Sequence, residues 1–350
     1  MGGAGQYQPL VRRGTEATST RVARTNKGGR QQVKLVIAGG YPEQQLKALR
    51  AEFPTVNFVH APTPADVLRE VPDADALYGW GAVNHEVLAV AKKLKWVHGP
   101  AAGAEWIRSV PEIIDMPIQV TNGRGAFAAT IAESAFGMLL YLTRNLGIYA
   151  ENQKKHAWAP AQRAAHVGLS GLTLGVLGLG KIGTAIADRG QAFQMEVIGC
   201  DAHDVARPSY VKRFWLLDGL NEFLKSSDVV MVTVPITPES RGMISATRLA
   251  LMKKCSYLIV VSRGGIVDEA ALPGFLHSGH LAGCGLDATD PEPLPADSPL
   301  WDAPHTIITP HTSGWSTQTS AAVVEVFKEN LRRFIAGQPL FTPVNKKLGY

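Results

Sequence analysis

Cysteine and long hydrophobic runs are both scarce in this 350-residue sequence. The three cysteines, Cys200, Cys255 and Cys284, form no C-x-x-C pair, which argues against a disulfide framework or a cysteine-built zinc site. The longest apolar runs, such as Phe136–Leu142, are much shorter than the roughly 20 residues that a membrane-spanning helix needs. We therefore predict a globular protein of a reducing compartment, the cytoplasm, with no metal site and no membrane partner.

Little net charge remains once the N-terminus is set aside. Residues 1–30 carry six of the 35 Lys and Arg residues and one of the 30 Asp and Glu residues, so the rest of the chain has 29 of each. Because residues 31–350 have no net charge, they do not attract a polyanion, and we expect no nucleic-acid partner. The Arg- and Gly-rich stretch 1–31 is predicted to be a disordered basic extension, although its composition also suits an organelle transit peptide.

Short apolar runs alternate with helical patterns along the first third of the ordered chain. The runs Val33–Ala38, Val56–His60, Ala76–Tyr78 and Trp96–His98 are the candidate strands, and Glu43–Glu52 is the first candidate helix. Strands that alternate with helices at this spacing indicate a parallel sheet covered by helices on both faces.

A second pattern of the same kind follows a change of composition at Thr121–Gly125. Phe127–Asn145 is a long helical stretch with apolar residues on most faces, which indicates a buried helix at a domain or subunit interface. The polar stretch Glu151–Arg163 leads into the second sheet. Six further runs are candidate strands: Leu172–Leu177, Glu196–Cys200, Val229–Val234, Tyr257–Val261, Cys284–Asp287 and Thr306–Thr309.

These patterns predict an α/β fold of two doubly wound parallel-sheet domains with a cleft between them. We place a first α/β domain at 32–125 and a second domain, with the layout of a Rossmann dinucleotide-binding domain, at 126–316. The last helical pattern, Ser320–Ile335, follows the sixth strand, so we expect 317–350 to return to the first domain.

A G-x-G-x-x-G run lies between an apolar strand pattern and a helical pattern. Gly178 permits the tight turn, Gly180 lets the backbone approach a pyrophosphate, and Gly183 lets the helix pack closely on the sheet. The free N–H groups of the helix N-terminus attract phosphates. The motif alone is weak, but its place between strand and helix predicts a dinucleotide site.

The residue that ends the next strand pattern, Asp201, predicts which dinucleotide binds. A carboxylate there accepts hydrogen bonds from the ribose hydroxyls and repels a 2′-phosphate. NADP-binding proteins commonly have an arginine just beyond this position, whereas Ala202 and His203 stand here. We predict NAD as the cofactor.

Three segments near the C-terminal ends of strands carry candidate catalytic groups. Arg263 ends one apolar run, Asp287 and Glu292 follow another, and His311 lies after the last. Ligand sites of open α/β sheets lie at these strand ends. Each residue taken alone is equally well explained as an ordinary loop arginine, turn acid or loop histidine.

Taken in order, the segments resemble the D-isomer-specific 2-hydroxyacid dehydrogenase family over about residues 33–350, and most strongly over 171–316. The matching residues are the GLGKIG run, Asp201, Val234-Pro235-Ile236-Thr237, Ser262-Arg263-Gly264, Asp287, Glu292-Pro293 and Thr309-Pro310-His311. The sequence departs from the family pattern at Ala288-Thr289, where Val-Phe is usual, and at Ser262, where alanine is common.

The resemblance implies that 32–125 is a flavodoxin-like substrate-binding domain and 126–316 a Rossmann NAD-binding domain. It implies that Arg263, Glu292 and His311 are the catalytic residues. It implies that the turn Ala102-Gly103 holds the acid group of the substrate, and that the protein is a homodimer to which the apolar helix contributes an interface. Besides the three glycines, it implies a cofactor site lined by Lys181, Ile182, Asp201, Val234, Pro235, Ser240, Val261, Ser262 and Asp287.

These residue types suit hydride transfer coupled to proton transfer. Arg263 would bind the carboxylate of a 2-keto acid and polarise its keto oxygen, while His311 would deliver the proton that the developing alkoxide needs. Glu292 would stabilise the imidazolium form of His311 and raise its pKa. Trp80 and Trp315 either face the cleft, which would favour a bulky or apolar 2-keto acid over glyoxylate, or serve in interdomain packing.

Two alternatives stay open at this point. Formate dehydrogenase shares the family's fold, but it has Gln-Pro where Glu292-Pro293 stands here, and phosphite oxidation is compatible with the same residues. The other alternative is a non-catalytic NAD(H)-sensing protein that resembles the transcriptional corepressors built on this fold. Turnover of 2-keto acids would distinguish the enzyme from the sensor.

Overall fold

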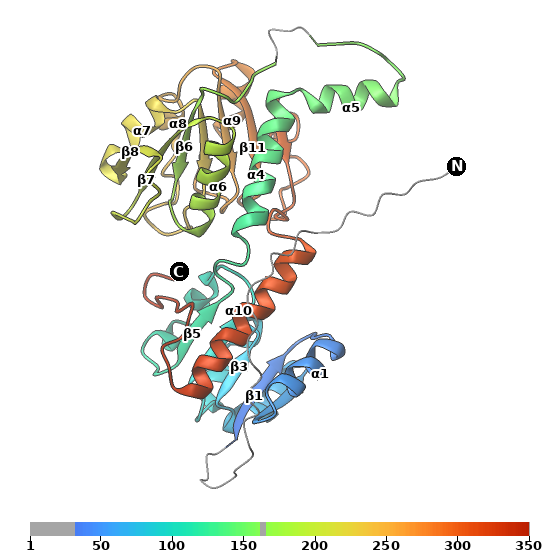
Figure 1. Ribbon diagram of the computed structural model, residues 1–350, viewed down its shortest axis with the longest axis vertical. Coiled ribbons are helices and arrows are strands. Elements are labelled where there is room, and N and C mark those ends of the chain that lie inside the picture. The colour runs from blue at the N-terminus through green and yellow to red at the C-terminus, as the bar shows by residue number, and fades with distance from the viewer. Residues whose placement is uncertain (1–31, 162–165, 350) are drawn as a thin grey trace, which may run out of the picture. The chain divides into compact units, whose positions relative to one another are not determined.

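The first of two parallel sheets follows directly on the start of the described chain. The computed structural model describes residues 32–161 and 166–349 (Figure 1), so the predicted basic extension 1–31 lies outside the described residues. The first sheet has the strand order β2-β1-β3-β4-β5, and every pairing in it is parallel. Its strands are β1 (Val33–Ala38), β2 (Val56–Ala61), β3 (Ala76–Tyr78), β4 (Trp96–Gly99) and β5 (Gln119–Asn122).

Strand β5 was not predicted because its sequence, QVTN, lacks the apolar run that marks the other four strands. It pairs with β4 in register, Trp96 opposite Gln119. The helices of this part are α1 (Glu43–Glu52), α2 (Pro64–Glu70) and α3 (His85–Val90), with 3₁₀ turns at Val71–Asp73, Trp80–Ala82, Glu105–Ser109 and Pro111–Ile114. The strand order is that of flavodoxin-like sheets, as predicted.

The second sheet has seven parallel strands in the order β12-β11-β10-β9-β6-β7-β8. They are β6 (Thr173–Leu177), β7 (Glu196–Asp201), β8 (Val211–Leu216), β9 (Val229–Val232), β10 (Ser256–Val260), β11 (Leu281–Leu286) and β12 (Thr306–Ile308). Strand β8 was not predicted because it is an edge strand whose charged residues Lys212 and Arg213 are exposed. Strands β7 and β8 are added on one side of β6 and β9 to β12 on the other, so the strand order reverses between β6 and β9, where a Rossmann sheet binds its dinucleotide. The predicted α/β fold class is confirmed.

A buried helix joins the two sheets in sequence. Helix α4 (Ala128–Thr143) lies beside α6 (Lys181–Ala192), as Figure 1 also shows, and its apolar side chains belong to the core cluster beneath β6, β9 and β10. Helix α5 (Leu146–Lys154) continues from it. The smaller helices of the second part are α7 (Leu220–Ser226), α8 (Ala246–Leu249) and α9 (Leu272–His277).

The C-terminal helix packs on the first sheet. Helix α10 (Thr317–Ala336) begins three residues earlier than the sequence pattern indicated, because Ser316 caps it by accepting a hydrogen bond from the Thr319 backbone at 2.9 Å. Its buried Phe327 stacks on Trp96 of β4 with ring centroids 5.9 Å apart. Within the two described stretches, no helix is both long and apolar enough to cross a bilayer.

Candidate active site

The turn between β6 and α6 has the shape of a phosphate-binding loop. Gly178 has a φ of 97°, which L side chains rarely adopt, and a Cβ on Gly183 would overlap the carbonyl oxygen of Gly178. A Cβ on Gly180, by contrast, would meet no atom within 4 Å, so open space lies beside the backbone at the helix N-terminus. This is the arrangement that a pyrophosphate needs, because its oxygens must approach backbone N–H groups closely.

Asp201 is fixed next to that loop. One of its carboxylate oxygens accepts a hydrogen bond from the Leu179 backbone at 2.7 Å, and the other accepts one from the His203 backbone at 3.3 Å. The carboxylate therefore sits at the end of β7 beside the glycine turn, where the predicted contact with a ribose requires it. The loop and Asp201 together fit a dinucleotide.

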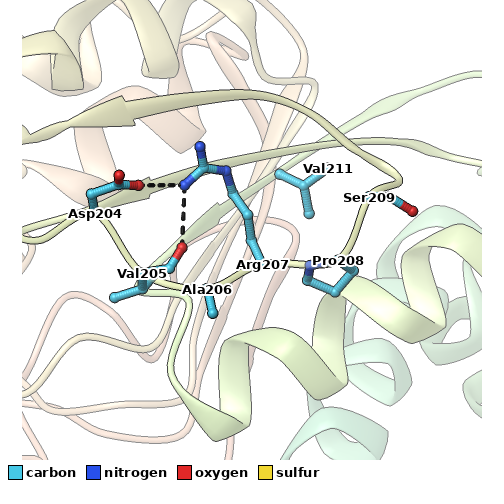
Figure 2. Close-up of a pocket in the computed structure, with 7 residues that line it drawn as sticks. All are labelled: Asp204, Val205, Ala206, Arg207, Pro208, Ser209 and Val211. Carbon is cyan, nitrogen blue, oxygen red and sulfur yellow. Dashed lines mark hydrogen bonds and ion pairs between the residues drawn. The ribbon is translucent and has the colours of Figure 1, made fainter.

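Sequence reasoning missed an arginine in the loop that follows Asp201. A pocket of about 480 Å³ is lined by residues 204–209 and Val211. Figure 2 shows these side chains, with Arg207 pointing toward Asp204. The Arg207 guanidinium donates to Asp204 at 2.6 Å and to the Val205 carbonyl at 3.2 Å, and it lies 4.1 Å from the centre of the Phe214 ring. Arg207 lies six residues beyond Asp201, whereas the arginine expected of an NADP-binding protein follows that carboxylate directly.

Ser240 and Pro235, both predicted to line the cofactor site, are joined in one turn. The Ser240 hydroxyl donates to the Pro235 carbonyl at 2.7 Å and accepts from the Thr237 backbone at 2.8 Å, which closes the segment that follows β9. Val234 is half-buried at its start, and Ile182 is half-buried on α6 beside the exposed Lys181.

At the end of β10, Val261 is buried in the core and Ser262 is also buried. The Ser262 hydroxyl is a buried side-chain oxygen without a hydrogen-bond partner in the described chain. A buried hydroxyl normally has a partner. An added ligand group at this point would satisfy it, which is a further observation in favour of a bound cofactor.

The guanidinium of Arg263 is already paired within the chain. Its Nε donates to Glu105 Oε1 at 2.9 Å, and its Nη1 donates to the Ser262 carbonyl at 2.8 Å. A Cβ on Gly103 would overlap both Glu105 Oε2 and Arg263 Nη2, so the predicted substrate turn and the predicted anchor are neighbours. Sequence reasoning missed Glu105 because nothing local distinguishes it from an ordinary helix-start acid.

His311 and Glu292 meet as the resemblance implied. His311 Nδ1 lies 2.9 Å from Glu292 Oε2, and both side chains are about two-fifths exposed. His311 has a φ of 54°, an unusual backbone conformation for a residue with a side chain, and its backbone N–H donates to the carbonyls of Asp287 and Thr309.

Buried Asp287 holds the histidine loop in place. Its carboxylate is 1% exposed and accepts from the Thr309 hydroxyl at 2.6 Å and from the Thr312 and Ser313 backbones at about 3 Å. These bonds position the loop that carries His311. A contact of Asp287 with the cofactor stays a prediction.

Glu269, which sequence reasoning also missed, ties the arginine segment to the glutamate segment. It accepts from the Gly265 backbone at 2.9 Å and from the Asp290 backbone at 3.0 Å, and its burial raises the pKa of this carboxyl. Close packing reinforces the link, because a Cβ on Gly264 would overlap the Thr289 backbone, whose N–H donates to Glu292 at 3.1 Å. A continuous set of contacts thus joins the three predicted catalytic segments.

The two tryptophans predicted near the substrate differ in their surroundings. Trp80 is half-buried and stacks on Trp106, with ring centroids 6.4 Å apart, whereas Trp315 is 77% exposed. A role of either ring toward a substrate stays a prediction. Within 32–161 and 166–349, no group of three or more His, Cys, Asp or Glu side chains is arranged to hold a metal ion.

Comparison with known proteins agrees with this geometry. Residues 136–313 match the family model of the D-isomer specific 2-hydroxyacid dehydrogenase NAD binding domain. A glyoxylate reductase of Korarchaeum cryptofilum is 33% identical over 314 residues, which cover 87% of this chain and 93% of that protein. A D-3-phosphoglycerate dehydrogenase of Methanocaldococcus jannaschii is 31% identical over 318 residues, which cover 89% of this chain but only 59% of that longer enzyme.

A solved structure shares both the fold and the family. The D-isomer specific 2-hydroxyacid dehydrogenase of Xanthobacter autotrophicus Py2, solved with NADPH, superposes with a TM-score of 0.75 at 29% identity, covering 91% of this chain and all of that one. The sequence motifs, the two parallel sheets and these matches agree. The chain belongs to the D-isomer specific 2-hydroxyacid dehydrogenase family and is an NAD(P)-dependent oxidoreductase.

Proposed function

We propose that this enzyme interconverts a 2-keto acid and a D-2-hydroxy acid, with Arg263 as the anchor of the acid, His311 as the general acid and base, and Glu292 as the partner of His311. The observation that carries the proposal is the 2.9 Å contact between His311 and Glu292, in a segment linked by direct contacts to that of Arg263. A histidine held by a carboxylate suits a reaction that moves a proton to or from oxygen.

Each group has a separate task in the proposed reaction. A nicotinamide cofactor, when bound at the glycine loop, would provide the chemistry of hydride transfer to or from the C2 carbon of the substrate. Arg263 binds the substrate carboxylate and polarises the keto oxygen through charged hydrogen bonds. His311 donates a proton to the oxygen as negative charge develops there, and Glu292 stabilises the imidazolium before the donation. In the reverse direction His311 accepts the proton from the hydroxyl.

We further propose NAD as the preferred cofactor. The Asp201 carboxylate is held beside the glycine loop, where it favours two ribose hydroxyls over a 2′-phosphate. Arg207 is an arginine of the following loop that could meet a phosphate, but its guanidinium is already paired with Asp204 and packed on Phe214. The relative from Xanthobacter autotrophicus was solved with NADPH, so the preference for NAD over NADP in this protein is to be tested by direct measurement.

We propose a homodimer, although the surface that supports it differs from the helix first considered. Helix α4 contributes most of its apolar side chains to the core of its own subunit. Large apolar side chains are exposed instead in and after α5, at Leu146, Ile148 and Trp158. Exposed apolar side chains are typical of an association surface where they form one patch.

Oxidation of NADH with a panel of 2-keto acids tests the proposed activity. We expect turnover with at least one acid, and a loss of at least about a hundredfold in kcat/KM in His311→Ala and in Arg263→Ala. His277→Ala, at the exposed end of α9, is the matched control and should retain activity. Binding of NADH without turnover of any acid would contradict the proposal and favour a sensor.

A further inference from the structure

Arg263, which we propose to bind the substrate carboxylate, is paired with a carboxylate of the protein itself, that of Glu105. Glu105 and Arg263 are 158 positions apart in sequence, yet Glu105 Oε1 lies 2.9 Å from Arg263 Nε. Both side chains are about one-third exposed. The pair is therefore partly shielded from water, so its charges are screened less than those of a surface pair.

The pairing leaves part of the guanidinium open. An arginine has five N–H donors. Nε donates to Glu105 and Nη1 donates once to the Ser262 carbonyl, while Nη2 faces Gly103. Gly103 packs against that edge without a side chain, because a Cβ there would overlap both Nη2 and Glu105 Oε2. A substrate carboxylate would use the N–H groups of Nη1 and Nη2 that have no partner among the described hydrogen bonds, while Glu105 stays on Nε.

The negative charge of Glu105 beside Arg263 reduces the attraction of this site for anions. Arg108 follows Glu105 by three residues on the same 3₁₀ helix, so its charge must be considered. Its guanidinium donates to the Ile236 carbonyl at 2.9 Å, and the side chain is exposed, which favours screening by solvent. The charge nearest to Arg263 in the described contacts is that of Glu105.

We propose that Glu105 is a specificity-determining residue, whose charge beside Arg263 selects 2-keto acids with a single negative charge over those with a second carboxylate or a phosphate. The inference rests on the proposed function, since it assigns Arg263 to the substrate carboxylate. One carboxylate of the substrate is balanced by the guanidinium. A second anionic group, held within several ångströms of Glu105, meets a net repulsion that the arginine has no charge left to offset.

Pairs of acids that differ by a second anionic group test this effect. 2-Oxopentanoate and 2-oxoglutarate have the same chain length but end in a methyl group and a carboxylate, and 3-phosphohydroxypyruvate is hydroxypyruvate with an added phosphate. We expect the enzyme to favour the singly charged member of each pair. Discrimination is measured as the ratio of kcat/KM within a pair, because this ratio compares binding in the transition state.

Glu105→Gln tests the role of the charge. The amide oxygen of glutamine can still accept from Arg263 Nε, so the hydrogen bond is kept while the negative charge is removed. We expect the kcat/KM ratio of the doubly to the singly charged acid to rise about fivefold in both pairs, mainly through a lower KM. The readout is this ratio and not the absolute activity, because Glu105 also contacts Arg263.

Two variants serve as controls. Glu112→Gln removes the same charge from a neighbouring 3₁₀ turn, where the carboxylate pairs with His85 instead, and should leave the ratio unchanged. Glu105→Asp keeps the charge and should keep the preference, even if kcat falls because the shorter side chain positions Arg263 less well.

The failures of the two proposals are distinguishable. No turnover of any 2-keto acid would contradict the proposed function. Turnover with an unchanged ratio in Glu105→Gln, or an equal change in Glu112→Gln, would overturn the role of Glu105 alone. Should Glu105→Gln fail to fold, loss of the preference in Glu105→Asp, or a wild-type enzyme that favours the doubly charged acids, would overturn it equally.

Discussion

His311 Nδ1 lies 2.9 Å from Glu292 Oε2, although 19 residues separate the two in sequence. In the proposed reaction the carboxylate orients the imidazole that transfers the proton, so we expect Glu292→Gln to lower kcat by about tenfold to a hundredfold. The KM for NADH should change little, since the substitution leaves the glycine loop and Asp201 intact. Steady-state kinetics with a saturating 2-keto acid measures both. A variant with unchanged kcat would show that Glu292 has no part in proton transfer.

The glycine loop offers a matched pair of substitutions. Gly183→Ala places a Cβ on the Gly178 carbonyl, so we expect the free energy of unfolding to fall by about 2 kcal/mol or more even without cofactor. Gly180→Ala meets open space in the chain, so it should fold normally but raise the dissociation constant of NADH at least about tenfold, because the methyl group blocks the approach of the pyrophosphate. Urea unfolding measures the stability of both variants, and fluorescence titration measures their binding of NADH. Equal losses of stability in the two variants would contradict the separate roles of Gly183 in packing and Gly180 in cofactor binding.

Asp201 is expected to set the cofactor preference. Replacing it by serine removes the charge that repels a 2′-phosphate, and we expect the ratio of kcat/KM for NADPH to that for NADH to rise by about tenfold to a hundredfold. Arg207→Ala should alter this ratio less than twofold, since Arg207 is engaged by Asp204 and Phe214. Initial rates with each cofactor at several concentrations provide the ratio. A selective loss of NADPH activity in Arg207→Ala would instead identify Arg207 as a phosphate ligand.

His98 is expected to make the fold sensitive to acid. It is fully buried on β4, and this burial lowers its pKa from 6.5 to about 3. Between these values the unfolded chain holds a proton that the folded chain does not, so stability falls as the pH drops from 6.5 toward 3, by up to about 5 kcal/mol. His98→Gln, which cannot take up this proton, should lose stability less steeply over that range.

The measurement for His98 is the free energy of unfolding in urea at several pH values between 7 and 4.5. The slope of this free energy against pH should be smaller in His98→Gln by nearly one proton toward the acid end. His277→Gln, at an exposed position on α9, should follow the wild-type slope. Parallel slopes for His98→Gln and the wild type would contradict the prediction.

Most of the fold was predictable because its signals are local. Ten strands were marked by apolar runs, and the two that were missed, β5 and β8, are a short polar strand and a charged edge strand. The glycine loop was recognisable because its backbone conformation and close packing require glycine at fixed spacing. The order of Arg263, Glu292 and His311 was recognisable because each follows a strand of one parallel sheet.

The sequence by itself determined the α/β class and the dinucleotide loop, and it predicts which groups do the chemistry. Only the tertiary structure decided that Glu105 lies on Arg263, that Asp287 holds the His311 loop, and that Glu269 joins two of the predicted catalytic segments. The physical reason is the range of the interactions. Strand and helix periodicity is set by neighbours within a few residues, whereas a contact between residues 158 positions apart depends on how the whole chain packs.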